Sequence, residues 1–161
     1  MRGRGMVLEL MDNLSQKSAW SQDQLQQFLL SASIPIRISA IDGDYPFICS
    51  VWFEYADGKL HVVSHKDSKL ARTLVREGRC AFEIAPNEPP YCGVRGKADV
   101  TAGEGDAEAT LKRLIERYLG DTNQGLASWL LGRAADEVVF TLHPTWATSW
   151  DYGGRMESAD I

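Results

Sequence analysis

The segment 34–64 constrains the fold most, because it carries two turn signals between stretches with the composition of β-strands. Asp42-Gly43-Asp44 and Ala56-Asp57-Gly58 each contain a glycine, which adopts positive φ without steric cost and so favours a hairpin. The flanking residues are rich in Ile, Val, Phe, Trp and Tyr, which are common in strands. The segment therefore predicts three strands joined by two hairpins, in the order of a meander.

Capping residues and periodicity predict the remaining elements. Ser21 stands three residues before Gln24, the spacing of a capping box, and Pro35 limits the helix that begins there. Residues 67–78 predict a second helix, with Asp67 or Ser68 as N-cap and Gly78 at its end. Further strands are expected at 79–85, 91–101, 137–142 and 146–150, and further helices at 104–119 and 126–135. About seven short strands with few helices favour a small closed or nearly closed β-barrel.

Length, charge and cysteine content narrow the class of protein. The 161 residues suit one domain, and a net charge of -5 argues against a dedicated nucleic-acid binder. No apolar run approaches the ~20 residues of a membrane helix, and Glu9 interrupts the apolar stretch near the N-terminus that a secretory leader would need. Cys49, Cys80 and Cys92 form an odd set without a CxxC pair. We expect a cytoplasmic protein that binds neither nucleic acid nor membrane.

The segment 62–76 is the most informative candidate site. Ser64 and Lys66 lead into a helix whose first turn holds Ser68 and Lys69. A helix N-terminus offers unpaired amides and the positive end of a dipole, so these side chains predict a phosphate site. On that helix Leu70, Ala71, Leu74 and Val75 are expected to face the sheet, and Lys69, Arg72, Thr73 and Arg76 the opposite side. The alternative is a solvated basic face on a helix that Ser68 merely caps.

Other patterns carry less chemistry. Gly103-Glu104-Gly105-Asp106 mimics a dinucleotide loop, but its acidic side chains would repel a pyrophosphate, so we interpret it as a turn with helix-capping acids. His61 and His65 share one face of a strand without a third ligand at suitable spacing, so we expect no metal. No Gly-x-Ser-x-Gly elbow is present, which leaves nucleophilic catalysis without support.

Several stretches taken in order carry a resemblance to a known family. Besides the N-terminal helix and the first Asp-Gly turn, they are Ile36-Arg37-Ile38-Ser39-Ala40, Ser50-Val51-Trp52-Phe53, Asp57-Gly58-Lys59-Leu60, Ser68-Lys69-Leu70-Ala71-Arg72-Thr73-Leu74, Gly93-Val94-Arg95-Gly96-Lys97-Ala98 and Thr148-Ser149-Trp150-Asp151-Tyr152. Together they resemble the pyridoxamine 5'-phosphate oxidase-like superfamily of flavin-binding split barrels. The resemblance implies a mainly β split barrel of about six to seven antiparallel strands with flanking α-helices. It covers a single domain at 21–152, with an N-terminal extension at 1–20 and a C-terminal tail at 153–161.

The resemblance also implies a site for FMN, or alternatively for a deazaflavin. Ser50, Val51 and Trp52 would lie along the flavin ring, and Val63, Ser64, Lys66, Ser68 and Lys69 would wrap the ribityl phosphate. Tyr91 and Arg95 would approach the ring or phosphate from a neighbouring strand, and Trp150 from the partner subunit of a homodimer. Trp52 and Trp150 have core packing as their alternative role, and Trp129 and Trp146 are assigned to packing.

The C-terminal segment departs from the oxidase proper. The family's Arg-x-His segment that grips pyridoxal phosphate has no counterpart, because no His follows Arg155. The resemblance therefore implies an FMN-binding oxidoreductase that passes hydride or electrons between a nicotinamide donor and an unknown small acceptor. Three alternatives stay open: a deazaflavin-dependent reductase, a non-catalytic flavin or haem carrier or redox sensor, and a cofactor-free interaction barrel.

Overall fold

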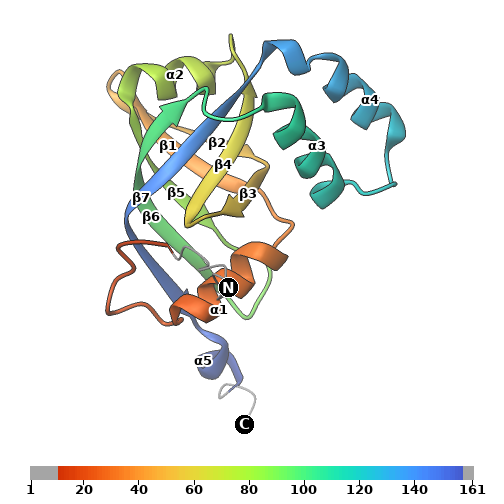
Figure 1. The fold of residues 1–161 in the computed structure, drawn as a ribbon. Helices are drawn as coiled ribbons and strands as arrows, with labels where there is room; N and C mark the ends of the chain where they lie inside the picture. Colours follow the sequence, from red (N-terminus) through yellow and green to blue (C-terminus); the bar gives the residue numbers. More distant parts are fainter. Residues whose placement is uncertain (1–10, 158–161) are drawn as a thin grey trace, which may run out of the picture.

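The computed structural model describes residues 11–157 and contains one seven-stranded sheet in the order β2-β1-β5-β6-β7-β4-β3. Every neighbouring pair of strands is antiparallel. The strands are β1 (Ile36–Asp42), β2 (Tyr45–Val51), β3 (Phe53–Ala56), β4 (Lys59–His65), β5 (Arg79–Ile84), β6 (Cys92–Ala102) and β7 (Glu137–Asp151). The sheet curls into a barrel, with helix α2 across one end, α1 at the other, and α3 and α4 projecting from one side (Figure 1). The expected fold class is confirmed.

The helices begin and end where their capping residues predict. Helix α1 (Gln22–Ser31) has a complete capping box, in which the Ser21 side chain accepts from the Gln24 amide and the Gln24 side chain accepts from the Ser21 amide. Helix α2 (Lys69–Glu77) is capped by Ser68 Oγ, which accepts from the Ala71 amide at 3.0 Å. Gly78 ends α2 in the left-handed region at φ 65°. Both helices are confirmed.

The expected meander is wrong. β1 pairs with β2 and β3 with β4 through the two expected turns, but β2 and β3 lie at opposite ends of the strand order. Trp52 alone separates β2 from β3, so the chain passes from one sheet edge to the other where the barrel curls back on itself. β1 takes β5 as its second neighbour and β4 takes β7. Turn residues specify a hairpin but leave the outer partner of each strand open.

The C-terminal strand is continuous, whereas the sequence predicted two strands separated by His143-Pro144. β7 carries Pro144 within its length, opposite Ala98 of β6. The next registered pair is Lys97 with Trp146, so Thr145 is the extra residue of a β-bulge. A bulge accommodates a proline that a regular ladder would not. The expected number of strands is nevertheless right, because the division of β2 from β3 offsets the union in β7.

The core is built from alternate strand positions, from residues of α1, α2 and α3, and from Met11. Its largest fully buried side chains are Phe53, Phe140, Met11, Leu25, Leu29, Ile36, Ile38, Leu60, Leu74, Ile84, Leu114 and Leu142. On α2 the buried stripe is centred on Leu70 and Leu74, which places Thr73 inside it at 1% exposure and leaves Val75 outside at 67%. The predicted faces of Thr73 and Val75 are therefore reversed. The buried side of α2, which carries Leu70 and Leu74, packs against the end of the barrel.

Helix α3 (Ala107–Tyr118) ties the projecting helices to the barrel. The Arg117 guanidinium donates to the carbonyls of Leu29 at 2.6 Å and Leu30 at 3.1 Å, and so satisfies carbonyls at the C-terminal end of α1. Tyr118 Oη donates to Ile34 O at 2.8 Å and accepts from the Phe53 amide at 3.1 Å. These contacts hold α3 beside the junction of β2 and β3.

The remaining elements are helix α4 (Gln124–Gly132), the 3-10 turn η1 (Ala134–Asp136) and helix α5 (Gly153–Glu157). Among residues 11–157, no helix combines the length and apolar character needed to cross a membrane. The residues from 1 to 10 and from 158 to 161, which belong to the expected extension and tail and include most of the segment tested for a leader, lie outside the described residues.

Candidate functional site

A cavity of about 320 Å³ lies where the β2–β3 junction meets α3 and α4. Its lining residues are Pro35, Ser50, Val51, Trp52, Val63, Leu111, Leu114, Leu126, Leu130 and Glu137. The volume lies at the lower end of the roughly 300–1,000 Å³ typical of small-molecule sites. The structure thus brings together Ser50, Val51 and Trp52, which the resemblance assigns to the ring of a cofactor, and Val63, which it assigns to the ribityl phosphate.

Trp52 forms a flat wall of this cavity. Its ring stacks on that of Tyr118 with centroids 5.0 Å apart and an interplanar angle of 5°. Hydrogen bonds of Tyr118 Oη with Ile34 and Phe53 fix the position of the Tyr118 ring against which Trp52 stacks. Four leucines from α3 and α4 also line the cavity. The cavity suits a flat, largely apolar group.

Glu137 is the one ionisable side chain among the described residues that line the cavity. Only 9% of its side chain is exposed, and the nearest basic atom, Arg133 Nη2, stands 3.9 Å from Glu137 Oε1. Burial raises the pKa of Glu137, with Arg133 and His65 acting against the rise. No motif in the sequence points to Glu137, which opens a strand. The cavity leucines were not predicted either, because their spacing on α3 predicts only an apolar stripe.

The junction of β4 and α2 adjoins the cavity, because Val63 lines the cavity and Ser64 follows it. Ser64 Oγ lies 2.7 Å from Ser68 Oγ. Lys66 Nζ forms an ion pair with Asp136 Oδ1 at 2.8 Å, and the Lys66 amide donates to the Asp136 carbonyl at 2.8 Å. The predicted phosphate residues Ser64, Lys66 and Ser68 therefore stand together, although each already has a partner within the chain.

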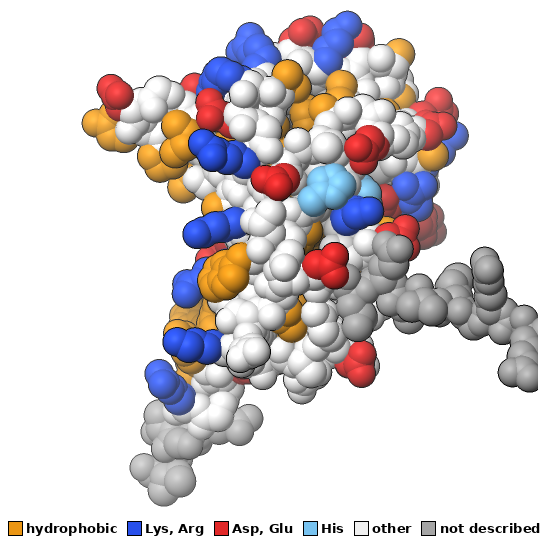
Figure 2. Space-filling model, turned by 60° about the vertical axis from the view of Figure 1, so that its left-hand side comes forward, with side chains coloured by type: hydrophobic (Ala, Val, Ile, Leu, Met, Phe, Trp, Pro, Cys, Tyr) orange, Lys and Arg blue, Asp and Glu red, His pale blue; other side chains and the backbone are white. Residues whose placement is uncertain are grey.

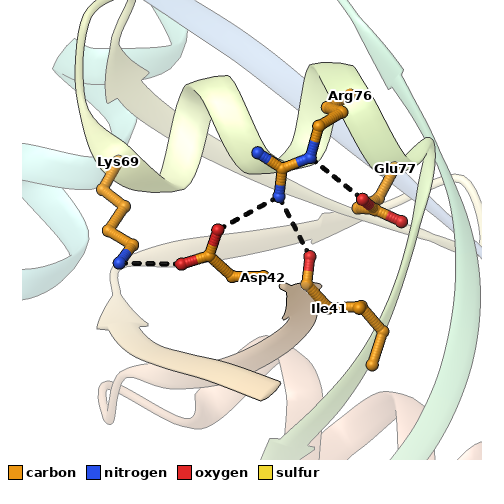
Figure 3. A network of polar contacts seen from close by, with 5 residues as sticks. All are labelled: Ile41, Asp42, Lys69, Arg76 and Glu77. Atoms are coloured by element: carbon orange, nitrogen blue, oxygen red, sulfur yellow. Dashed lines mark hydrogen bonds and ion pairs between the residues drawn. The ribbon is translucent and has the colours of Figure 1, made fainter. Parts of the chain in front are cut away.

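Lys69 and Arg76 share one carboxylate, as Figure 3 shows. Lys69 Nζ lies 2.8 Å from Asp42 Oδ2, and Arg76 Nη2 lies 3.3 Å from Asp42 Oδ1 and 3.1 Å from Ile41 O. The hydrogen bond from Lys69 is the largest cause that lowers the pKa of Asp42. Lys69 and Arg76 thus lie on the same side of α2, as the predicted basic stripe requires, and that side faces the end of β1.

These pairings decide what the junction can hold. The side chains of the Lys66–Asp136 pair are 54% and 51% exposed, and those of the Lys69–Asp42 pair 57% and 31% exposed. Ion pairs in water are weak, so a dianion that accepts several hydrogen bonds can replace the carboxylates. The junction and the cavity together fit a ligand with a flat apolar body and an anionic end.

The other predicted residues lie elsewhere on the sheet. Arg95 Cζ stands 5.6 Å from the centroid of the Trp150 ring, so these two are in contact. Ser50, Arg37, Glu83 and Arg95 are successive cross-strand neighbours on the outer face of the sheet. Three strand spacings amount to about 14 Å. Within one chain, Arg95 and Trp150 therefore do not line the cavity that Ser50 lines.

Tyr91 is also outside the cavity. Its side chain is 48% exposed, and its carbonyl accepts from the Tyr152 amide at 2.9 Å. This contact fastens the loop before β6 to the end of β7. Tyr91 and Trp150 therefore lie at one end of the β6–β7 pair, beside Arg95.

Two further hollows cover the outer face of the sheet. One of about 410 Å³ includes Arg37, Ile48, Arg95 and Trp146, and a neighbour of about 470 Å³ shares Ser39, Ala81 and Lys97 with it. Figure 2 shows hydrophobic side chains gathered along a concave side of the molecule, while acidic, basic and histidine side chains mix over the face in view. Trp146 is 39% exposed and Trp129 57% exposed, so their assignment to packing is wrong.

The weaker patterns have structural roles. Asp106 Oδ1 accepts from the Ala109 amide at 3.0 Å as the N-cap of α3, which confirms the helix-capping interpretation. His61 Nδ1 lies 3.1 Å from Thr141 Oγ1. Among residues 11–157, no group of three or more His, Cys, Asp or Glu side chains is placed to hold a metal ion. Cys49, Cys80 and Cys92 are free thiols, and of these only Cys80 is buried.

Comparison with known proteins gives relatives by structure alone. No protein-family model and no curated protein sequence matches the chain. The conserved hypothetical protein Rv2991 from Mycobacterium tuberculosis superposes with a TM-score of 0.70 at 18% identity, over 87% of this chain and 90% of that one. A putative pyridoxamine 5'-phosphate oxidase from Listeria innocua gives 0.61 at 17% identity, over 79% and 95%.

An F420 reductase is similar over 76% of this chain and 94% of its own, with a TM-score of 0.59 at 20% identity. At sequence identities this low, the superpositions show a shared fold and nothing more specific. The chain has the split-barrel fold of the pyridoxamine 5'-phosphate oxidase-like proteins, and the resemblance in its sequence is confirmed at the level of the fold.

Proposed function

We propose that this protein binds FMN, or alternatively the deazaflavin F420, and acts as an oxidoreductase that passes hydride between a nicotinamide donor and a small acceptor. The carrying observation is the apolar cavity of about 320 Å³ that adjoins a cationic, hydroxyl-lined junction. The ring system would occupy the cavity, and the phosphate the junction of β4 and α2. We include F420 as an alternative to FMN because an F420 reductase shares the fold.

The chain's own residues would bind and orient the cofactor. Trp52, held against Tyr118, offers a flat face to a ring, and leucines of α3 and α4 exclude water from it. Ser64 and Ser68 supply hydroxyls, and Lys66 and Lys69 supply charge, to an anionic tail. The cofactor supplies the hydride chemistry when bound.

We also propose a homodimer with the cofactor sites at the subunit interface. Two hollows and the exposed side chains of Ile48 and Trp146 leave apolar surface open on the outer face of the sheet. Pairing of that face would let Arg95 and Trp150 of the partner subunit approach a cavity that they do not reach within their own chain. Sedimentation at micromolar concentration tests the dimer, and a monomer there contradicts it.

Titration of the purified protein with FMN and with F420, followed by absorbance and fluorescence, tests cofactor binding. Lys69→Ala should weaken binding by roughly 1.5–3 kcal/mol, the value of a charge-assisted hydrogen bond. Arg72→Ala is the matched control, because Arg72 is an exposed cation on the same helix. Failure to take up either cofactor overturns the function, and equal affinities of wild type and Lys69→Ala remove Lys69 from the phosphate site.

The same preparation separates an enzyme from a carrier. Anaerobic addition of NADH or NADPH should bleach the bound cofactor if the protein is an oxidoreductase. A bound cofactor that neither donor reduces favours the carrier or sensor. A haem spectrum on addition of haem, without uptake of FMN or F420, favours the haem-binding alternative.

A further inference from the structure

The cavity holds a carboxyl group whose surroundings are unusual for a charged side chain. Glu137 opens β7 and stands opposite His65 in the register of β4. Its side chain is nine-tenths buried and lies among the leucines of α3 and α4. Its basic neighbour Arg133 is too distant, at 3.9 Å, for a normal hydrogen bond. Burial of this kind disfavours the charged carboxylate and favours the protonated carboxylic acid.

Charged groups from three directions act on Glu137. Arg133 follows α4 and His65 ends β4, and both favour the carboxylate. Asp136, the preceding residue, favours the protonated acid, although its own charge is paired with Lys66. Burial is the largest influence and raises the pKa of Glu137. The surroundings therefore extend the pH range over which Glu137 keeps its proton.

We propose that Glu137 is the proton donor of this site and that the acceptor, which binds against the cofactor ring within reach of Glu137, is an uncharged molecule with a polarised double bond. The inference rests on the proposed function, which supplies the hydride. In the step, hydride from the reduced cofactor forms a C–H bond at one end of the double bond. The O–H bond of Glu137 breaks and its proton bonds to the other end. The Glu137 carboxylate then regains a proton from water, so charge and electrons balance.

The lining argues for an uncharged acceptor. Besides Glu137, the described lining residues are apolar except for the Ser50 hydroxyl and the Trp52 indole, so no cation stands there to pair with an anion. An anionic acceptor would be buried in an apolar site without a cationic partner, which costs free energy. Glu137 thus supplies the proton, and the apolar lining disfavours acidic acceptors.

The first test needs no cofactor. In protein labelled with 13C at the glutamate carboxyls, NMR titration should show one resonance with a midpoint above the ~4.3 of an ordinary glutamate. That resonance should vanish in Glu137→Gln and persist in Glu54→Gln. Glu54 is the matched control, because its side chain is only 16% exposed but is held by Arg113 at 2.8 and 2.9 Å. An ordinary midpoint for the Glu137 resonance overturns the proposal.

The second test uses the cofactor-loaded protein in a single turnover, with cyclohex-2-enone as the uncharged acceptor. Compared with wild type at equal cofactor loading and after full reduction by the nicotinamide donor, Glu137→Gln should oxidise about 10²–10⁴-fold more slowly with the acceptor. Glu54→Gln should oxidise at the wild-type rate. Equal rates for Glu137→Gln and wild type, or no oxidation of wild type by the acceptor, overturn the proposal. Cofactor uptake in the same samples reports on the proposed function separately.

Discussion

The cavity and the β4–α2 junction adjoin each other but treat charge in opposite ways. At the junction, Lys66 and Lys69 each lie 2.8 Å from a carboxylate oxygen, and more than half of each lysine side chain is exposed. In the cavity, Glu137 is nine-tenths buried and its nearest basic atom is 3.9 Å away. The junction keeps its charged side chains paired and exposed to solvent, whereas the cavity keeps the Glu137 carboxyl largely buried and without a close ion pair.

The difference shows which charges a ligand can use. Water screens the ion pairs of the junction, so replacing their carboxylates by a phosphate costs little. A charged ligand group would be costly in the cavity, because a charge buried there loses its hydration. A ligand that spans both regions would place its anionic end at the junction and its neutral part in the cavity.

The largest expected effect concerns the apolar wall of the cavity. Leu114 is 2% exposed and contacts both the core and the cavity, so Leu114→Ala should lower the free energy of unfolding by about 2–5 kcal/mol. Urea denaturation followed by tryptophan fluorescence measures the loss. Leu30→Ala, at a site 53% exposed, should change it far less. Equal losses would show that the cavity wall carries no more stability than the surface.

The second effect tests the lone acid through its pH dependence. Burial raises the pKa of Glu137, so between its ordinary value and the raised one the native state binds more protons than the unfolded state. Stability due to this group therefore falls as pH rises through that interval. Glu137→Gln removes the penalty, so its melting temperature relative to wild type should increase from pH 4 to pH 8. A difference independent of pH would contradict the buried-acid description.

The features that could be predicted from the sequence depend on contacts between residues close together in the chain. Ser21, Ser68 and Gly78 act on residues within one helical turn, so α1 and α2 follow from them. The Asp-Gly turns likewise predict two hairpins correctly. The resemblance supplied the fold, which periodicity alone left as a closed or nearly closed barrel.

The parts that could not be predicted depend on contacts between distant segments. Asp42 and Asp136 reach the two lysines from other elements, and nothing near Lys66 or Lys69 in the sequence announces them. The burial of Glu137 depends on leucines of α3 and α4, which line the same cavity but are distant from Glu137 in the sequence. The bulge at Thr145 lets β7 run through Pro144, because the partner strand decides whether a proline interrupts a ladder.

The smallest expected effect concerns the exposed pair at the junction. Lys66→Ala should leave stability at pH 7 and physiological salt almost unchanged, since the side chains of Lys66 and Asp136 are half exposed. The hydrogen bond from Lys66 lowers the pKa of Asp136, so what the pair contributes is present above the ordinary aspartate pKa and is lost as pH falls through the lowered one. Melting curves at pH 7 and pH 3, in low and high salt, should therefore converge for variant and wild type under acidic or high-salt conditions. A large loss at pH 7 that persists in high salt would mean that the junction, like the cavity, holds a charge that water does not screen.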